Sequence, residues 1–186
     1  MKSSSIMPDG SLLGQSGAYC DLEDGARIYY EIHGRGDYLV LMHGGLEPME
    51  SLYGMADLLS RSFTVIIPEQ RGHGRTPDTP GPYRYEQFSR DTVFLMESLG
   101  IPSAHLAGFS DGAITALFMG LFFPERVTTI TSIGGNYHYP GLSRKFAIMI
   151  ESLTAESFAA KNRRSVDIYR NVSPDGPDHF PVVFNK

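Results

Sequence analysis

The chain has 186 residues, of which 41% are hydrophobic and 20% are charged, and its formal net charge is -5. This length is typical of one globular domain around one core, and a mildly acidic chain without a dense Lys/Arg cluster does not favour nucleic acid or anionic lipid as a partner. A single cysteine, Cys20, excludes an intramolecular disulfide and a cysteine-rich zinc site, and it fits a reducing compartment.

Residues 1–16 are polar and rich in Gly and Ser, and we expect them to form a disordered tail. Their longest apolar run is Leu12-Leu13, whereas a secretory signal needs about 7 to 15 apolar residues. No stretch of the sequence approaches the roughly 18 to 20 apolar residues that cross a bilayer. The sequence therefore predicts a cytoplasmic protein that does not associate with membranes.

From residue 18 onward, short β-rich runs alternate with helix-length stretches, which is typical of an α/β domain. Asp24-Gly25, between residues 18–23 and 26–33, is a strong signal for a two-residue turn and predicts an antiparallel hairpin. A mostly parallel sheet should follow, with strands over residues 38–42, 63–67, 104–109 and 127–133. The helices expected between these strands span residues 49–60, 85–99 and 111–123.

Beyond Asn136 the sequence predicts helices over residues 146–153 and 155–170, with Thr154 as the cap of the second. The next run that resembles a buried strand is Val182-Val183-Phe184, after a Pro/Asp/Gly-rich segment. We therefore expect an α/β core over residues 17–136 and a helical cap or lid over residues 137–186.

The strongest motif is Gly108-Phe109-Ser110-Asp111-Gly112, a G-x-S-x-G pattern between a predicted strand and a predicted helix. This context is that of a nucleophile elbow, a sharp turn that exposes a serine hydroxyl and that flanking glycines allow to close. Ser110 could instead be an ordinary helix N-cap, but a cap would not need both glycines. A helix N-terminus also directs partial positive charge at a developing oxyanion, with the N–H of Asp111 as the expected donor.

A second donor is expected from His43-Gly44-Gly45, which follows the strand predicted over residues 38–42. The two glycines give flexible backbone that can direct an N–H at the same oxyanion, and Gly45 is the candidate. We expect His43 to pack or hydrogen-bond beneath this loop and to take no part in catalysis.

The order of these motifs along the chain resembles that of the α/β-hydrolase superfamily, in particular its branch with a serine nucleophile. The resemblance runs from about residue 17 to residue 136 and includes the hairpin, an oxyanion strand and loop at residues 39–45, a loop of D-x-R-G-x-G type at residues 68–75, and the elbow. The chain departs from the family at Glu69, because members often carry Asp two residues before the arginine. We expect Arg71 to tether loops by hydrogen bonds and not to touch substrate.

Within the superfamily, residues 108–117 and Ile133-Gly134-Gly135-Asn136-Tyr137 resemble the valacyclovir-hydrolase (biphenyl-hydrolase-like) group and related bacterial hydrolases. In that group the acidic residue after the nucleophile binds the α-amino group of an amino-acid ester, which implies that Asp111 could hold a substrate ammonium. The alternative is that Asp111 is only a favourable charge at a helix N-terminus, worth ~0.3 to 1 kcal/mol. The residues expected to line the substrate pocket are Leu46, Phe109, Asp111, Tyr137, Phe146 and Met149.

A serine hydrolase of this family also needs a histidine base and an acid that orients it, in the chain order Ser, Asp or Glu, His. The histidines after Ser110 are His138, which no suitably placed acid precedes, and His179. A triad of His179 with Asp167 or Asp175 would require the lid to supply both partners, on a loop-rich segment with little rigid support. We therefore expect the chain to stop before the acid, the histidine and the family's seventh and eighth strands.

Two consequences follow if these strands, the acid and the histidine are missing. Residues 127–133 would form an exposed, β-branched edge strand, which is an aggregation hazard. The hydrolysis rate should also fall by about 10⁴ to 10⁶ relative to a complete triad, so we expect an inactive or weakly active fragment.

The expected function is hydrolysis of a small ester, amide or related acyl bond by Ser110, on a small-molecule substrate and without a metal or other cofactor. Two alternatives stay open: a non-catalytic ligand-binding or receptor module on the same fold, and perhydrolase (haloperoxidase-type) activity at the same serine. Epoxide hydrolases and dehalogenases are disfavoured because they carry Asp at the position of Ser110. The sequence leaves the substrate's identity and the oligomeric state open.

Overall fold

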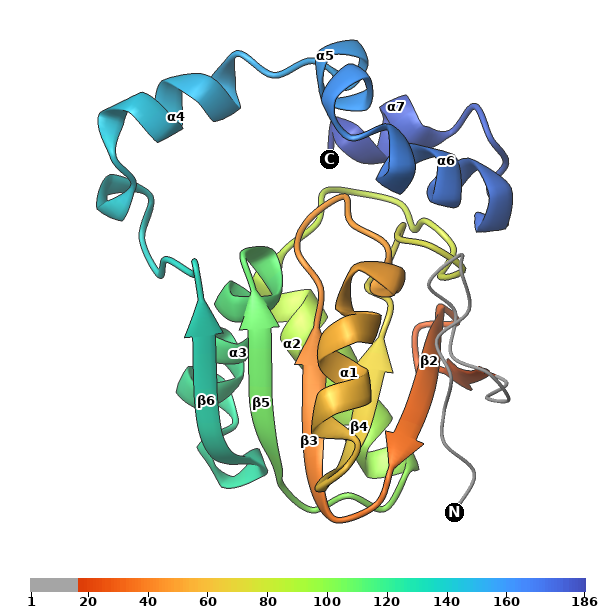
Figure 1. The fold of residues 1–186 in the computed structure, drawn as a ribbon, viewed down its shortest axis with the longest axis vertical. Coiled ribbons are helices and arrows are strands. Elements are labelled where there is room, and N and C mark those ends of the chain that lie inside the picture. Colours follow the sequence, from red (N-terminus) through yellow and green to blue (C-terminus); the bar gives the residue numbers. More distant parts are fainter. Residues whose placement is uncertain (1–16) are drawn as a thin grey trace.

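The computed structural model describes residues 17–186, so the tail predicted for residues 1–16 lies outside the described residues. Its strands form one sheet in the order β1-β2-β4-β3-β5-β6 (Figure 1). In chain order they are β1 (Ala18–Asp21), β2 (Arg27–Gly34), β3 (Asp37–Met42), β4 (Phe63–Pro68), β5 (Ala104–Phe109) and β6 (Val127–Ile133). Neighbours from β4 to β6 run parallel, whereas β1 pairs with β2 and β2 with β4 antiparallel. The predicted mostly parallel sheet with an antiparallel N-terminal hairpin is confirmed.

The turn of the hairpin is longer than the two-residue turn that the sequence predicts. Strand pairing ends at Asp21 and Arg27. Between them the N–H of Leu22 donates to the carbonyl of Ala26 at 2.7 Å, and the N–H of Gly25 donates to the carbonyl of Leu22 at 3.0 Å. Gly25 has a φ of 84°, which glycine adopts without steric strain, and a turn that ends in a left-handed glycine matches the twist of the strands.

Helices cover both faces of the sheet (Figure 1). α2 (Tyr85–Ser98) and α3 (Asp111–Phe122) pack against one face, and α1 (Tyr53–Leu59) packs against the other. The 3-10 helix η1 (Met49–Leu52) precedes α1, so the helix predicted over residues 49–60 is in two parts. Such 3-10 turns are common at helix N-termini.

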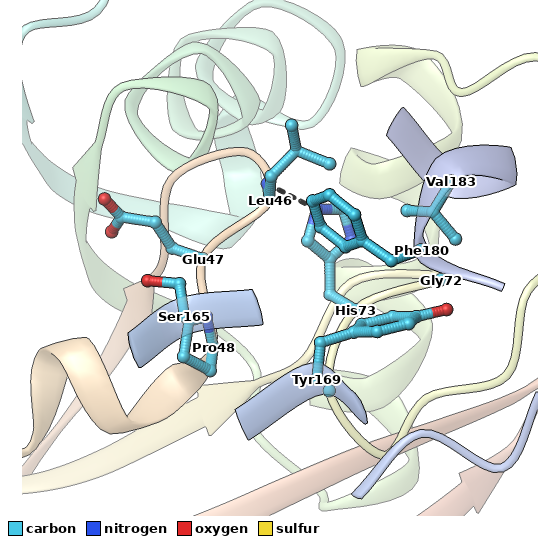
Figure 2. A pocket seen from close by; sticks show the side chains of 10 residues that line it. Leu46, Glu47, Pro48, Gly72, His73, Ser165, Tyr169, Phe180 and Val183 are labelled. Atoms are coloured by element: carbon cyan, nitrogen blue, oxygen red, sulfur yellow. Dashed lines mark hydrogen bonds between the residues drawn. The ribbon is translucent and has the colours of Figure 1, made fainter. Parts of the chain in front are cut away.

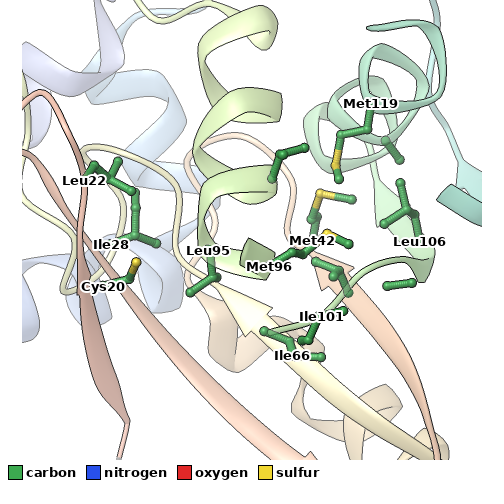
Figure 3. Packing of buried hydrophobic residues seen from close by; sticks show 14 residues of the cluster. Cys20, Leu22, Ile28, Met42, Ile66, Leu95, Met96, Ile101, Leu106 and Met119 are labelled. Carbon is green, nitrogen blue, oxygen red and sulfur yellow. The ribbon is translucent and has the colours of Figure 1, made fainter. Parts of the chain in front are cut away.

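The central strands are buried on both faces, which explains their unbroken apolar sequence. Val40 and Met42 of β3 belong to the core under α2 and α3 (Figure 3), whereas Leu39 and Leu41 belong to the core under α1. Successive side chains of a strand point to opposite faces, so a strand covered on both sides needs apolar residues at every position.

β6 is the edge of the sheet beside β5. Among the described residues it pairs with β5 alone, and most of its side chains are exposed. A short 3-10 helix, η2 (Pro124–Arg126), leads into it from α3. The strand contains neither Lys nor Pro, so its outer backbone groups are available for pairing with another strand.

Beyond β6 the chain is helical. It forms η3 (Tyr139–Gly141), α4 (Arg144–Glu151), α5 (Ala155–Lys161), α6 (Arg163–Val172) and α7 (Phe180–Phe184). α5, α6 and α7 share an apolar cluster that includes Val166, Tyr169, Phe180 and Val183, and this cluster packs on the core at Leu46 and Tyr83. α4 has no buried residue and lies apart from this cluster (Figure 1).

Two predictions for this helical segment are wrong. Residues 155–170 do not form one helix, because the chain breaks at Asn162, whose φ of -120° and ψ of 44° are not helical. Val182-Val183-Phe184 is not strand-like but lies in α7, where a proline in the first turn favours a helix start and the apolar side chains pack on α5 and α6. The predicted cap is confirmed, since the side chain of Thr154 accepts the N–H of Ser157 at 3.1 Å. None of the helices within residues 17–186 combines the length and the apolar character needed to cross a membrane.

Candidate active site

Ser110 occupies a strained turn between β5 and α3. Its φ of 51° and ψ of -116° lie outside the regions that non-glycine residues prefer, which costs on the order of 1–3 kcal/mol. A Cβ at Gly108 would lie 2.3 Å from the carbonyl oxygen of Gly112, and a Cβ at Gly112 would lie 2.4 Å from the carbonyl oxygen of Met42. The spacing of glycine, serine and glycine in the sequence is therefore a steric requirement of the turn.

Neighbouring elements hold this turn from both sides. The N–H of Ser110 donates to the carbonyl of Ile133, at the end of β6, at 2.9 Å. The carbonyl of Ser110 accepts the N–H of Ile114, in the first turn of α3, at 3.0 Å. These bonds fix the serine backbone in a conformation that the sequence alone disfavours.

The two predicted oxyanion donors lie next to this serine. A Cβ at Gly44 would lie 3.4 Å from Cβ of Ser110, so the loop of residues 43–46 approaches this serine closely. Asp111 is the first residue of α3. Within residues 17–186, the N–H groups of Gly45 and Asp111 make no hydrogen bond to a protein acceptor. Both N–H groups therefore keep an open donor.

The carboxylate of Asp111 lies over the oxyanion loop. Its Oδ1 accepts the hydroxyl of Tyr85 at 2.8 Å, and a Cβ at Gly45 would lie 2.0 Å from its Oδ2. Asp111 thus has a partner in the protein that the sequence does not reveal, because Tyr85 is remote from it in the chain. The carboxylate of Asp111 is therefore held beside the backbone of Gly45.

A cavity of about 250 Å³ lies between the oxyanion loop and the C-terminal helices. It is lined by Gly45, Leu46, His73, Tyr83, Arg84, Tyr85, Phe88, Asp111, Val183, Phe184 and Lys186. Next to it, α6 and α7 close tightly over the loop and leave about 10 Å³ between Leu46, His73, Tyr169 and Phe180 (Figure 2).

Of the residues expected to line the substrate pocket, Leu46 and Asp111 line this cavity and the other four do not. Phe109, Phe146 and Met149 are exposed, and Tyr137 is 85% exposed. Phe109 is the last residue of β5, Tyr137 follows β6, and Phe146 and Met149 lie on α4, which has no buried residue. Nothing among the described residues closes a pocket around them.

The buried histidines near the site bond to backbone. Nδ1 of His43 lies 2.8 Å from the carbonyl of Gly44, and its Nε2 accepts the N–H of Gln70 at 3.1 Å. Burial and the neighbouring His73 lower the pKa of His43 to about 3. His43 therefore hydrogen-bonds beneath the oxyanion loop, as the sequence predicts.

The described residues bring no histidine into a hydrogen bond with the hydroxyl of Ser110. His138 is exposed. Nε2 of His179 lies 2.9 Å from Oδ2 of Asp78 and pairs with neither Asp167 nor Asp175. The lid triad is therefore not formed within residues 17–186.

His179 instead belongs to a cluster around Asp78, which sequence analysis missed. Oδ1 of Asp78 accepts Nζ of Lys186 at 2.7 Å and the hydroxyl of Tyr83 at 2.6 Å. The N–H of Asp78 donates to Oδ2 of Asp175 at 2.7 Å. Although burial raises the pKa of Asp78, the hydrogen bonds from Lys186, Tyr83 and His179 lower it to about 2. This cluster docks α7 onto the core.

Arg71 tethers three segments, as predicted. Its Nε and Nη2 donate to the two carboxylate oxygens of Asp91 in α2 at 2.6 and 2.8 Å, and its Nη1 lies 2.7 Å from Asp24 in the hairpin turn. Glu69, where the chain departs from the family pattern, is fully buried and accepts the N–H of Arg75 at 2.6 Å and its Nη1 at 2.9 Å. Burial raises the pKa of Glu69 to about 8, against the lowering effect of the Arg75 guanidinium.

Metal ligands do not gather at this site or elsewhere in the described part of the chain. Across residues 17–186, no three His, Cys, Asp or Glu side chains lie close enough together to hold a metal ion.

Comparison with known proteins places the chain in a family. A model of the alpha/beta hydrolase fold matches residues 37–168. The putative carbamate hydrolase RutD of Azorhizobium caulinodans is 30% identical over 120 residues, which are 64% of this chain and 45% of that protein. The human serine hydrolase BPHL is 34% identical over 119 residues, which are 61% of this chain and 41% of that protein.

Solved structures share the fold at low sequence identity. A hydrolase from Pseudomonas aeruginosa PA01 superposes with a TM-score of 0.69 at 18% identity, over 91% of this chain and 71% of that one. The enol-lactonase of Burkholderia xenovorans LB400 gives 0.66 at 20% identity, over 90% of this chain and 70% of that one. The chain matches less than half the length of the curated relatives named above. By its matched residues and its fold, the chain belongs to the α/β-hydrolase family.

Proposed function

We propose that Ser110 is the nucleophile of a serine hydrolase that cleaves a small ester, amide or related acyl bond. The observation that carries the proposal is the strained serine at the N-terminus of α3, next to two N–H groups without protein acceptors. Strain of this kind persists where the surrounding structure enforces it, and it concentrates at functional sites.

In the proposed reaction, Oγ of Ser110 attacks the carbonyl carbon and the carbonyl oxygen becomes an oxyanion. The N–H groups of Gly45 and Asp111 would donate to it, and the helix dipole of α3 would add partial positive charge. Removal of one such donor from a serine hydrolase costs about 2.7 to 4 kcal/mol of transition-state stabilisation. The oxyanion then re-forms the carbonyl and expels the alcohol or amine, which takes up the proton that Ser110 gave to the base, and the acyl group stays on Oγ. Water, deprotonated by the same base, attacks this acyl-enzyme and releases the carboxylic acid, and the proton returns to Oγ of Ser110.

The base that takes the proton of Ser110 is the part that the described residues do not supply. A base and its orienting acid contribute about 10⁴ to 10⁶ to the rate of such enzymes. We therefore propose that these 186 residues alone hydrolyse substrate slowly or not at all, and that a complete catalytic unit draws its base from additional polypeptide.

The charge of the site bears on the substrate. Asp111 lines the cavity of about 250 Å³ together with Arg84 and Lys186, and Lys186 is paired with Asp78, so a cationic group of a substrate should bind on the Asp111 side of the cavity. The names of the relatives, a carbamate hydrolase and an enol-lactonase among them, are compatible with small acyl substrates.

Labelling by a fluorophosphonate tests the proposal. We expect the probe to phosphonylate Ser110 in the folded chain, to react faster when imidazole is added as an external base, and to leave Ser110→Ala unlabelled at that peptide. Mass spectrometry of peptides locates the label, and the urea-unfolded chain is the control. Labelling of Ser110 no faster than in the unfolded chain would reject the serine as an activated nucleophile.

The absence of a histidine at Ser110 among the described residues favours one second candidate, a ligand-binding module that keeps the cavity without turnover. That candidate predicts saturable binding of a small cationic ester with no labelling of Ser110 at any imidazole concentration. Perhydrolase activity would use the same serine, and it is distinguished by acyl transfer to hydrogen peroxide in preference to water.

A further inference from the structure

Two buried imidazoles join the oxyanion loop of residues 43–46 to the loop of residues 70–73. Nε2 of His73 accepts the N–H of Leu46 at 2.9 Å (Figure 2). Nδ1 of His73 lies 2.9 Å from the carbonyl of Arg71. His43 makes the matching pair of contacts in the opposite direction, to Gly44 and Gln70. The two rings lie 5.0 Å apart.

The hydrogen-bond pattern sets the protonation state of both rings. An imidazole nitrogen that accepts an N–H must carry a lone pair, and one that faces a carbonyl must carry a proton. Each ring is therefore neutral, with its proton on Nδ1. A proton added to Nε2 of His73 would place two N–H groups against each other and break the bond to Leu46.

Leu46 needs this bond because its backbone is strained. Its φ of 59° lies in the left-handed region that residues with a Cβ rarely adopt. The amide that His73 holds is the peptide bond between Gly45 and Leu46. Fixing the plane of this peptide restricts the backbone rotation of Gly45, whose own N–H is the candidate oxyanion donor.

The surroundings of His73 keep its ring neutral. Burial lowers the pKa of His73, and its hydrogen bonds to the Arg71 and Gln70 backbone and the carboxylates of Asp111 and Asp78 partly oppose this effect. The other titratable and charged groups near the ring are His43, Tyr83, Tyr85, Arg84, Tyr169, Glu47 and Lys186.

We propose that His73 is a positioning residue for the oxyanion loop: its neutral Nε2 holds the Gly45–Leu46 peptide, so that the N–H of Gly45 stays directed toward Ser110. Loss of the acceptor, by substitution or by protonation, releases this peptide. The role of the loop in catalysis rests on the proposed function, whereas the hydrogen bond by which His73 positions the Leu46 amide does not.

Two amide variants of His73 separate this role from simple packing. His73→Gln can place its amide oxygen near the position of Nε2 and keep an acceptor for Leu46. His73→Asn can place its amide near Nδ1, keep the contact with the Arg71 carbonyl and lose that acceptor. We expect the exchange protection of the Leu46 amide, measured by NMR in the full chain, to fall roughly tenfold in His73→Asn and to stay within about twofold of the wild type in His73→Gln. The amide of Val40 in β3 is the internal reference.

The state of the ring is measured in the unaltered chain. Nitrogen-15 spectra at pH 7 should give His73 as a neutral ring with its proton on Nδ1, a result that does not depend on whether any variant folds. A charged ring, a proton on Nε2, or a Leu46 amide without protection in the wild type would overturn the proposal. Equal protection of Leu46 in the two folded variants would also overturn it.

The rate at which the fluorophosphonate labels Ser110 then shows whether the position of the loop affects the reactivity of the serine. We expect labelling to slow about tenfold in His73→Asn and to recover in His73→Gln. An unlabelled wild type with a protected Leu46 would reject the proposed function while leaving the hold of His73 established, so the two failures are distinguishable.

Discussion

The hydroxyl of Tyr85, the first residue of α2, donates to Oδ1 of Asp111, the first residue of α3, at 2.8 Å. The ring of Tyr85 packs against Phe88 and Phe118, so the hydroxyl has little freedom to turn away. Two helix N-termini are therefore joined through the carboxylate that lines the cavity next to Ser110.

Tyr85→Phe should lower the free energy of unfolding by about 1.5 to 3 kcal/mol, because the Asp111 carboxylate loses the hydrogen bond from the Tyr85 hydroxyl and gains no other protein donor. Urea denaturation measures this. Tyr137→Phe is the matched control, since Tyr137 is 85% exposed and should change stability by less than about 0.5 kcal/mol. Equal effects of the two substitutions would show that the Tyr85 bond contributes nothing.

Gly112→Ala should destabilise the fold by about 3 kcal/mol or prevent it, because the new Cβ would lie 2.4 Å from the backbone oxygen of Met42, which cannot move without shifting β3. Gly54→Ala, in α1, is the control. A Cβ there meets nothing within 4 Å, so the substitution should leave the stability unchanged or raise it by up to about 1 kcal/mol. Thermal unfolding of both variants would decide, and a fully stable Gly112→Ala would contradict the described elbow.

Asp91→Ala should cost about 3 to 5 kcal/mol, because it leaves the buried guanidinium of Arg71 without its two-point partner. Asp24→Ala removes the other carboxylate of the same arginine. The side chain of Asp24 is half exposed, so this loss should be about 1 kcal/mol or less. A larger effect at Asp24 than at Asp91 would reverse the order that burial predicts.

The stability of the fold should fall below about pH 6.5 through His43. Its pKa is about 3 in the folded chain and about 6.5 when unfolded, so between these values the unfolded state binds the proton and the folded state does not. The expected slope is at most about 1.4 kcal/mol per pH unit for this ring. Urea unfolding of wild type and His43→Asn from pH 7 to pH 5 measures it, and the difference between the two proteins should shrink as the pH falls. Parallel curves would mean that His43 is not held neutral.

Asp78→Asn should loosen the docking of α6 and α7. Asp78 keeps a pKa of about 2 against 3.8 in the unfolded chain, so its stabilising contribution is present above about pH 4 and is lost as the pH falls through 2. At pH 7 we expect the amides of α6 to exchange about tenfold faster in the variant, while those of β3 stay unchanged. Asp167→Asn is the control, because Asp167 is exposed and its partner Arg170 lies within α6. Unchanged exchange in Asp78→Asn would show that the apolar cluster alone holds these helices.

Much of the core could be read from the sequence, because its signals are local. Leu39 to Met42 form an unbroken apolar run since helices cover both faces of β3. Gly108 and Gly112 were informative because backbone atoms occupy the space that a side chain would need. The turn therefore requires glycine at both positions.

The site's polar contacts could not be predicted in the same way, because their partners are far apart in the chain. Asp78 forms side-chain contacts with His179 and Lys186, which lie more than 100 residues further along the chain. No hydrophobic periodicity predicts such contacts. The apolar residues predicted to line a substrate pocket illustrate a related point. Apolar character at Phe109 and Phe146 signals contact with some partner, but it does not identify one, and the described residues leave both exposed.

The bond from the N–H of Ser110 to the carbonyl of Ile133 makes β6, at the edge of the sheet, a support for the backbone of this serine. Fraying of that strand would loosen the bend without any change at the serine itself. Conversely, a polypeptide that paired along the free side of β6 would stiffen the backbone of Ser110 from a distance, so strand pairing at this edge and the conformation of the serine are mechanically linked.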